Sequence, residues 1–351
     1  VKNYGAKGDG VTDDSISIQN AINYASANNV NLIIPASSNY YKVNNTLTLK
    51  SNLHISGYGA TLFMPSQASV KNIFISNSTT FIDNVSIEGL SLKSANDRAG
   101  TEYQINSLTS NVQGMYIQGI SNFTMKDVRM DNMYDGLKLG AASNGVLNNN
   151  INIDNLQIYN SRTPLLMLAT KDFVMSNSVL DANGGKTYFL HAAYIGGDTS
   201  NLLFNNVKFA NSPGGGIHIY NGHTTKKAAQ DIVVENSTFE NNRVGAYVYS
   251  GASNITFSNN TVTNTGLAFK ILSVSNVNIN NVDISQQKYN DGSNGAFYIA
   301  YASTSQISDV TVDGAGMTGN LFDFGENVSD LTVSRLQVKN FPDNGVFNTP
   351  V

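Results

Sequence analysis

Histidine is rare in this 351-residue sequence, yet three of its four His residues lie within 33 positions, at His191, His218 and His223. An imidazole titrates near neutral pH and can serve as a general acid or base. We predict that His191 and His218 are catalytic and that the polar segments after them contribute to the site. Those segments carry Asp198, His223, Lys226 and Lys227. The alternative is two surface imidazoles that share the region by coincidence, and we expect His54 to be structural.

Short alternating runs that begin near a Gly hold the second group of candidates. If the residue after each Gly points inward, the next one points outward. The outward column then reads Tyr116, Lys138, His191, His218, Tyr247, Lys270, Tyr298 and Asp323, with Leu166 or Met167 as the apolar exception, and Gln118, Tyr220 and Tyr249 lie one register further along. A Tyr ring offers a flat apolar body and a hydroxyl, which suits sugars. We therefore predict a glycan groove, and the substrate-binding candidates are Tyr116, Tyr220, Arg243, Tyr247, Tyr249 and Tyr298. The alternative is an ordinary sheet surface, because Tyr is a good strand former.

Charged residues in the turns before these runs are the third group. They are Asp135, Arg162, Asp181, Lys186 and Arg243. We predict catalytic roles for Asp135, Asp181 and Arg162, and for Lys138 in the adjoining run. For each of them the alternative is a solvated turn residue, since such residues are common in turns.

The composition excludes several classes of function. Charged residues make up 13% of the chain and the formal net charge is −4, so we expect no nucleic acid or anionic membrane as partner. The absence of Cys excludes disulfides, a thiol nucleophile and thiolate metal sites. No apolar run approaches the 18 residues of a membrane span. We predict no metal and no other cofactor, with calcium as the alternative. Because the chain begins at Val1 without a visible signal peptide, we interpret it as a mature or excised segment.

An internal repeat indicates the elements that position these candidates. A six-residue phrase usually begins with Asn or Asp, alternates apolar and polar residues, and usually ends on Asn, Asp or Gly, with a degraded copy that begins at Thr304. Its copies lie at 52–57, 84–89, 122–127, 150–155, 172–177, 201–206, 231–236, 254–259, 276–281, 304–309 and 330–335. From Asp127 onward the copies recur every 22 to 30 residues, which is enough for three short strands and their turns. This is the length of one coil of a parallel β-solenoid, too long for an 18-residue hexapeptide coil and too short for a propeller blade of about 40 residues.

The last position of the phrase explains the abundance of Asn. Asn tolerates the left-handed conformation of a tight turn, and stacked amides can hydrogen-bond from coil to coil. The candidate ladder is Asn155, Asn177, Asn206, Asn236, Asn259 and Asn281. We interpret these residues as structural and not as sugar-binding.

The amino-terminal segment predicts a cap and resembles a known family. Apolar residues of the stretch 15–27 recur at helical spacing, which predicts a short helix that covers the open first coil. Residues 4–14 read YGAKGDGVTDD, and this motif, the helix and the Ile33-Ile34-Pro35 run resemble the start of the pectate-lyase-like superfamily. The resemblance implies an all-β chain, with one right-handed parallel β-helix domain over 1–351, a cap at 15–27 and repeats over roughly 47–351. Within this motif Asp13 and Asp14 are expected to be turn and helix N-terminal residues.

The resemblance also implies a class of substrate. The superfamily includes pectate lyases, polygalacturonases, mannuronan epimerases and phage tailspike depolymerases, which bind polysaccharide along the outside of the helix. We therefore expect a secreted, extracellular or virion-associated polysaccharide depolymerase, with a glycoside hydrolase favoured over a lyase. The alternatives are a uronan lyase or C5-epimerase and a non-catalytic glycan-binding adhesin or phage receptor-binding module. A tailspike module would be a homotrimer.

Two chemistries follow from these alternatives. Elimination from a uronate needs a base at C5 and a cation on the carboxylate, with His191 or His218 as the base and Lys138, Arg162 or Arg243 as the cation. Hydrolysis needs two carboxylates, about 5–5.5 Å apart for retention or about 6.5–9.5 Å for inversion. Asp135, Asp181 and Asp198 are the candidates. The polygalacturonase motifs and the epimerase DPH phrase are not found, and Tyr134-Asp135-Gly136 is only a weak echo of the latter.

Overall fold

The computed structural model describes residues 1–65, 69–76, 79–95, 111–183, 187–221, 227–285, 295–341 and 347–348. The chain forms two compact units. The first comprises Val1–Val179 and Asn183–Lys186, and the second comprises Leu180–Ala182 and Thr187–Val351. The expectation of a single domain over 1–351 stays a prediction.

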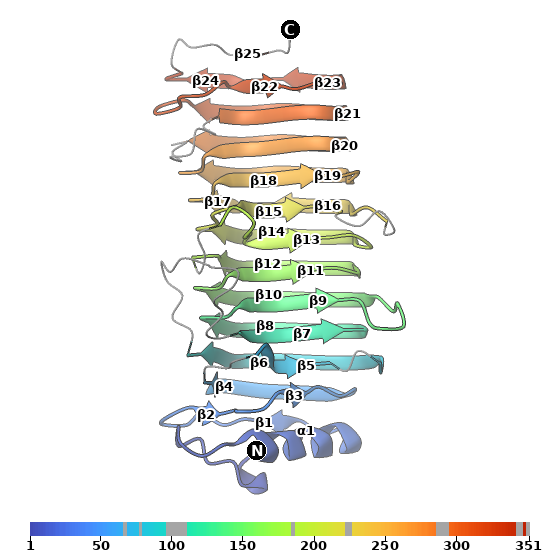
Figure 1. The fold of residues 1–351 in the computed structure, drawn as a ribbon, viewed down its shortest axis with the longest axis vertical. Coiled ribbons are helices and arrows are strands. Elements are labelled where there is room, and N and C mark those ends of the chain that lie inside the picture. Colours follow the sequence, from blue (N-terminus) through green and yellow to red (C-terminus); the bar gives the residue numbers. More distant parts are fainter. Residues whose placement is uncertain are drawn as a thin grey trace. The chain divides into compact units, whose positions relative to one another are not determined.

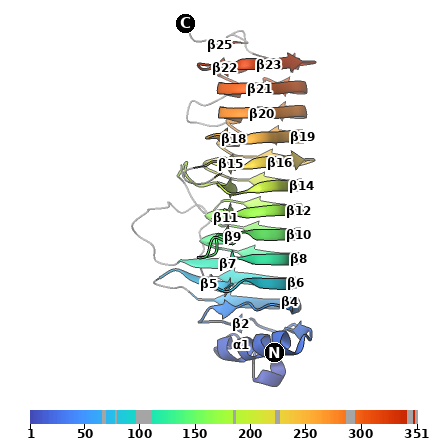
Figure 2. The same ribbon diagram turned by 90° about the vertical axis from the view of Figure 1, so that its right-hand side faces the viewer.

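The first unit begins with the cap and continues as stacked strands. Its elements are η1 (Lys2–Tyr4), α1 (Ser15–Asn28), β1 (Leu32–Ile33), β2 (Tyr41–Lys42), β3 (Leu47–Thr48), β4 (Leu53–Met64), β5 (Lys71–Ile75), β6 (Ile82–Ser94), β7 (Val112–Gln118), β8 (Ile120–Asp131), β9 (Asp135–Gly140), β10 (Asn148–Tyr159), β11 (Thr163–Met167) and most of β12 (Thr170–Asp181). Long strands pair in parallel in the order β4–β6–β8–β10, and shorter ones in the order β5–β7–β9–β11. Figure 1 and Figure 2 show both series rising from α1 at the N-terminal end of this unit.

The second unit repeats the same arrangement. Its strands are β13 (Ala193–Ile195), β14 (Ser200–Ala210), β15 (Gly215–Ile219), β16 (Gln230–Glu235), β17 (Thr238–Glu240), β18 (Val244–Tyr249), β19 (Ser253–Thr263), β20 (Leu267–Ser285), β21 (Gly295–Asp313), β22 (Phe322–Phe324), β23 (Ser329–Ser334), β24 (Gln337–Lys339) and β25 (Phe347–Asn348). Short strands β13, β15 and β18 pair in parallel and continue into β20, β21 and β22. The prediction of a right-handed parallel β-helix is confirmed.

Alternation along the strands separates the core from the outer face. In β18 Ala246 and Val248 are fully buried, whereas Tyr247 between them is only partly buried. The core of the second unit contains stacked Phe rings, with Phe209 and Phe239 5.0 Å apart and Phe297 and Phe322 4.8 Å apart. Because each ring sits on the equivalent ring of a neighbouring coil, the core holds the coils in register.

The cap forms where the sequence predicts it. The helix α1 buries its apolar stripe, which consists of Ile18, Ala21, Ile22 and Ala25. Asp14 accepts hydrogen bonds from the backbone N–H groups of Lys7 and Gly8, and Asp13 accepts one from Ser15 N–H. Both carboxylates are therefore engaged in the turn before the helix. Among the described residues, no helix has the length and apolar character needed to cross a membrane.

The six predicted ladder Asn residues all adopt the left-handed conformation, with φ between 50° and 57°. Their hydrogen bonds are less regular than predicted. Asn281 Nδ2 donates to Asn259 Oδ1 over 2.8 Å, but Asn236 reaches Asn205 and Asn177 reaches Asp154. A more regular ladder begins at the first position of the phrase, where Asn276 donates to Asn254 over 2.8 Å and Asn254 donates to Asp231 over 2.7 Å.

The pairing of β13 with β15 shows that one residue was assigned wrongly to the predicted outward column. Tyr194 pairs with His218, which pairs with Tyr247, and the column continues through Lys270, Tyr298 and Asp323. The prediction that His191 belongs to this column is wrong. His191 lies before β13, because Ala192 N–H bonds to Gly215 O and Ala193 then faces the core beside Ile217.

Candidate active site

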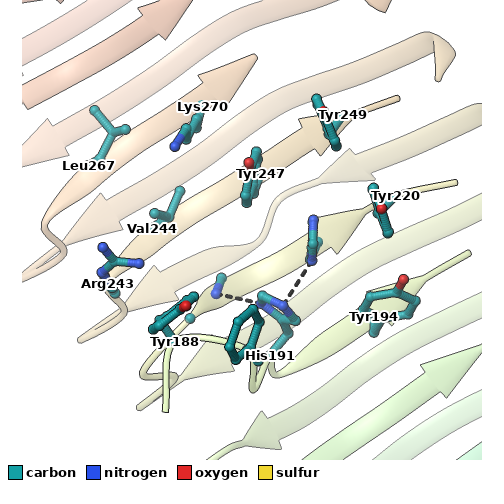
Figure 3. Close-up of a pocket in the computed structure, with 14 residues that line it drawn as sticks. Tyr188, His191, Tyr194, Tyr220, Arg243, Val244, Tyr247, Tyr249, Leu267 and Lys270 are labelled. Atoms are coloured by element: carbon teal, nitrogen blue, oxygen red, sulfur yellow. Dashed lines mark hydrogen bonds between the residues drawn. The ribbon is translucent and has the colours of Figure 1, made fainter. Parts of the chain in front are cut away.

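A cavity of about 490 Å³ lies on the outer face of β13, β15, β18 and β20, within the second unit (Figure 3). Its lining consists of Tyr188, Phe189, His191, Tyr194, Gly214, Gly215, His218, Tyr220, Arg243, Val244, Tyr247, Tyr249, Leu267 and Lys270. Six of the residues predicted for the site meet here, namely His191, His218, Tyr220, Arg243, Tyr247 and Tyr249. The cavity is therefore the place where the predicted groups come closest together.

The two imidazoles form a hydrogen-bonded pair. His191 Nε2 lies 2.8 Å from His218 Nδ1, and Gly215 N–H donates to His191 Nδ1 over 2.7 Å (Figure 3). His191 is 5% exposed. These contacts join β15 to the segment before β13, so the fold of two neighbouring coils sets the orientation of both rings.

Burial keeps both imidazoles neutral. It lowers the pKa of His191 well below its usual value, and the neighbouring His218 lowers it further. Burial, followed by the charge of Lys270, lowers the pKa of His218 to about 4. Near pH 7 each ring therefore has one protonated and one unprotonated nitrogen.

The aromatic rings of the cavity stack on one another. Tyr220 and Tyr249 are stacked with centroids 5.4 Å apart and an interplanar angle of 5°. His218 and Tyr247 stack at 4.6 Å and 13°, and Lys270 Nζ lies 5.0 Å from the Tyr247 centroid. The ring of Tyr247 therefore contacts both His218 and Lys270, and Tyr220 and Tyr249 each cover one face of the other.

Two cations give the cavity its charge. Lys270 and Arg243 line it, and within the part of the chain that the structure describes no Asp or Glu belongs to the lining. Burial and the charge of Arg243 lower the pKa of Lys270. Burial also raises the pKa of Tyr247, and it raises that of Tyr194 to about 12, so both phenols stay protonated at neutral pH. The cavity combines cations, neutral imidazoles and phenolic donors.

A separate cluster in the first unit contains two more of the predicted catalytic residues, Asp135 and Arg162. Asp135 is 2% exposed and accepts hydrogen bonds from Arg162 Nη2 over 2.8 Å and Gln113 Nε2 over 2.9 Å. The Arg162 guanidinium lies 3.8 Å from the centroid of the Tyr134 ring and also donates to its hydroxyl. Asp135 was expected to be either catalytic or a solvated turn residue, and its burial excludes the second of these.

The other predicted residues lie outside the cavity lining. Lys138 Nζ lies 4.5 Å from the Tyr116 ring in the first unit. Asp181 accepts a hydrogen bond from Asn211 over 3.0 Å, and Asp198 accepts one from the backbone of Lys227. Tyr298 contacts Lys270 from the next coil. His223, Lys226 and Lys186 fall outside the described residues.

Sequence reasoning missed several residues of the site. Tyr194 occupies the column position assigned to His191, and Tyr188 and Phe189 border the cavity with 56% and 64% of their surfaces exposed. Lys270 was in the column but was not named as catalytic or binding. The one signal in the sequence was the adjacent aromatic pair Tyr188-Phe189 before His191 in a chain with few exposed aromatics.

The fold identifies the class of protein, and comparison with known families gives the family. The family profile described as "Right handed beta helix region" matches residues 71–226 and 191–349, so the chain belongs to the right-handed β-helix family. The profile "Rhamnogalacturonase A/epimerase, pectate lyase-like" matches residues 1–92, which carry the amino-terminal motif. The predicted relationship to the pectate-lyase-like superfamily is confirmed.

Individual relatives are more distant. The chain is 28% identical over 221 residues to mannuronan C5-epimerase AlgE1 of Azotobacter vinelandii, an alignment that covers 53% of this chain but only 15% of that protein. Among solved structures it resembles the A-module of mannuronan C-5 epimerase AlgE6 from the same organism, with 17% identity, a TM-score of 0.71 and coverage of 100% and 99% of the two chains. It also resembles an N-terminal fragment of gene product 12 of bacteriophage phi29, with 16% identity, a TM-score of 0.70 and coverage of 98% and 71%. At these identities the structural likeness concerns the fold alone.

Proposed function

We propose that this chain is a polysaccharide-modifying enzyme that acts on an acidic glycan by removing the C5 proton of a uronate, as a lyase or a C5-epimerase. The observation that carries the proposal is the charge of the cavity, which Lys270 and Arg243 line without any Asp or Glu among the described lining residues. A cation-lined cavity favours an anionic ligand, and the carboxylate of a uronate is such an anion. The epimerase relatives support the same substrate class.

The lining also argues against hydrolysis, which the sequence favoured. Hydrolysis in most glycosidases uses a pair of carboxylates that flank the scissile bond. Asp135 is held in an ion pair in the first unit, and Asp181 accepts a hydrogen bond from a turn residue. Removal of a C5 proton needs no such pair, so we prefer it to hydrolysis.

Each group of the cavity then has a role. When the C5–H bond breaks, its electron pair moves toward the carboxylate, and Arg243 stabilises the charge that develops there. The hydroxyl of Tyr247 stays protonated because its pKa is raised, so it can donate a proton to the glycosidic oxygen or to the opposite face of C5. The candidate for accepting the C5 proton is Lys270 in its neutral form, which its lowered pKa makes more accessible.

The location and assembly of the protein follow from the substrate. An acidic polysaccharide is found outside cells, so we propose an extracellular or virion-associated protein, in keeping with the phage protein and the pneumococcal surface adhesin among its structural neighbours. A homotrimer stays a prediction for the case of a phage module.

The test compares products on matched polymers. The purified chain is incubated with polymannuronate, polyguluronate and polygalacturonate in D₂O, with a neutral glucan as the control. Elimination produces an unsaturated uronate that absorbs in the ultraviolet, and epimerisation places deuterium at C5 without cleavage. New reducing ends without either signal would indicate hydrolysis and overturn the proposal. Binding with no product would favour a glycan-binding module instead.

A further inference from the structure

The proton positions on the imidazole pair follow from one backbone group. Gly215 N–H can only donate, and it donates to His191 Nδ1 over 2.7 Å between two buried residues. His191 Nδ1 must therefore offer a lone pair. A neutral imidazole has one N–H, so the proton of His191 lies on Nε2.

The same argument passes to the second ring. His191 Nε2 carries a proton and lies 2.8 Å from His218 Nδ1, so it donates and His218 Nδ1 accepts. The proton of neutral His218 is then on Nε2. Burial and the nearby charge of Lys270 lower the pKa of His218 to about 4, which keeps this ring neutral at pH 7.

His218 Nε2 lacks an acceptor among the described residues. The atom is buried beside the rings of Tyr220, Tyr247 and Tyr194, whose centroids lie 5.4, 4.6 and 5.3 Å from the imidazole centroid. A buried donor without a partner destabilises the folded state, so this N–H group is free to donate to a ligand. His218 is part of the cavity lining. A small displacement of a Tyr ring would therefore open this N–H group to an oxygen of a ligand bound in the cavity.

We propose that His218 acts as a neutral Nε2–H hydrogen-bond donor to an oxygen of the bound sugar acid, and that His191 is the positioning residue that fixes this tautomer. This assignment rests on the proposed function only for the identity of the ligand. It replaces the role of base predicted for His218, because Nδ1, its one lone pair, is occupied by His191. A neutral imidazole is a suitable donor to an oxygen on which negative charge develops. Lys270 is then the described group of the cavity best suited to accept the C5 proton.

The first test reads the tautomers directly in the free protein. The full chain contains four His residues, so a long-range ¹⁵N–¹H spectrum of the ¹⁵N-labelled protein at pH 7.5 should resolve all of them. Loss of signals in His191→Gln and His218→Gln variants assigns the two rings. We expect the Nε2-protonated tautomer for both. An Nδ1-protonated or doubly protonated His218 would overturn the proposal.

The second test uses a ligand and a matched control. On addition of a short polymannuronate, polyguluronate or polygalacturonate oligomer that binds, we expect the His218 Nε2–H signal to shift while the tautomer stays unchanged. His191→Gln should weaken binding of that oligomer about tenfold, because His218 then samples both tautomers. His54→Gln, which changes a His in the first unit, should bind as the parent protein does. Equal binding by all three proteins, or conversion of His218 to imidazolium on binding, would contradict the assignment.

The two proposals fail separately. The expected tautomers in a protein that forms no uronate product would overturn the proposed function alone. Elimination or epimerisation by a protein whose His218 carries its proton on Nδ1 would overturn the tautomer assignment alone.

Discussion

Each of the two units contains a cluster in which a cation lies against a Tyr ring. The two clusters differ in whether a carboxylate neutralises the cation. In the first unit Arg162 covers the ring of Tyr134 and binds the buried carboxylate of Asp135. In the second unit Lys270 covers the ring of Tyr247 in a cavity where no described lining residue carries a carboxylate. Both pairings join side chains of neighbouring coils.

The difference separates a stabilising role from a binding role. A cation that neutralises a buried carboxylate of the same fold prevents an unpaired buried charge and has little charge left for a ligand. A cation in an open cavity without a carboxylate makes that cavity attractive to an anion. Residue type and position in the coil are thus insufficient to separate the two roles, and the partner decides.

The largest expected effect is a loss of stability when the cluster of Arg162 and Asp135 in the first unit is broken. Arg162→Met should lower the free energy of unfolding by about 3–5 kcal/mol, because it leaves the Asp135 carboxylate buried without its charge partner. Urea unfolding followed by circular dichroism measures this loss. The control is Arg129→Met, which removes an exposed Arg–Asp pair that also covers a Tyr ring and should cost less than about 1 kcal/mol. Equal losses in the two variants would mean that burial of Asp135 is energetically unimportant.

The next effect is a pH dependence of the cavity. The folded-state pKa of His218 is about 4 and its unfolded value is 6.5, so the unfolded chain binds more protons between these values and stability falls as the pH drops through this window. The loss should be on the order of 3 kcal/mol by pH 4. The groups facing the ring are His191, Lys270, and the Tyr residues of the cavity.

Comparison with His218→Phe isolates this contribution. The variant keeps a ring of similar shape and has no proton to bind, so its unfolding free energy should fall less steeply between pH 6.5 and pH 4. Parallel pH profiles for the two proteins would show that His218 is not held neutral by the fold.

The two lysines above Tyr rings offer a functional comparison. Lys270→Met should lower kcat/KM on the uronan substrate about 100-fold or more, since removal of the group that accepts the proton has an effect of this size. Lys138→Met removes the equivalent contact above Tyr116 in the first unit and should cause a much smaller change. Steady-state kinetics of both variants measure the difference. A larger loss for Lys138 would place the active site in the first unit.

The smallest expected effect is a loss of stability in the Asn turns, which lie outside both clusters. Asn254 has φ of 57°, donates to Asp231 and accepts from Asn276. Asn254→Ala should cost about 1 kcal/mol, because Ala tolerates the left-handed conformation poorly. Asn254→Gly should cost less, since Gly adopts this conformation freely. Thermal unfolding compares the two, and an equal loss would assign the stability of the turn to the amide hydrogen bonds instead.

Much of the fold could be predicted because its signals are local. The period of two along each strand placed Tyr247 and Lys270 on the outer face, and the repeat length indicated coils of three strands. The left-handed turns followed from Asn itself, which tolerates that conformation at the end of each phrase. The amino-terminal motif and its helical spacing were sufficient for the cap.

The site depended on contacts between coils, which the sequence does not encode locally. His191 and Gly215 are 24 positions apart in the sequence. Their hydrogen bond fixes the position of His191 just before β13, and it determines the tautomer that we propose for both imidazoles. Asp135 and Arg162 are 27 positions apart, and only their pairing shows that this carboxylate is buried. The sequence by itself therefore determined the coil and the side of each strand, because these follow from short-range periodicity. Tertiary structure decided which charges are neutralised internally and which line a cavity, because turn lengths vary and set the stacking of each coil on the next.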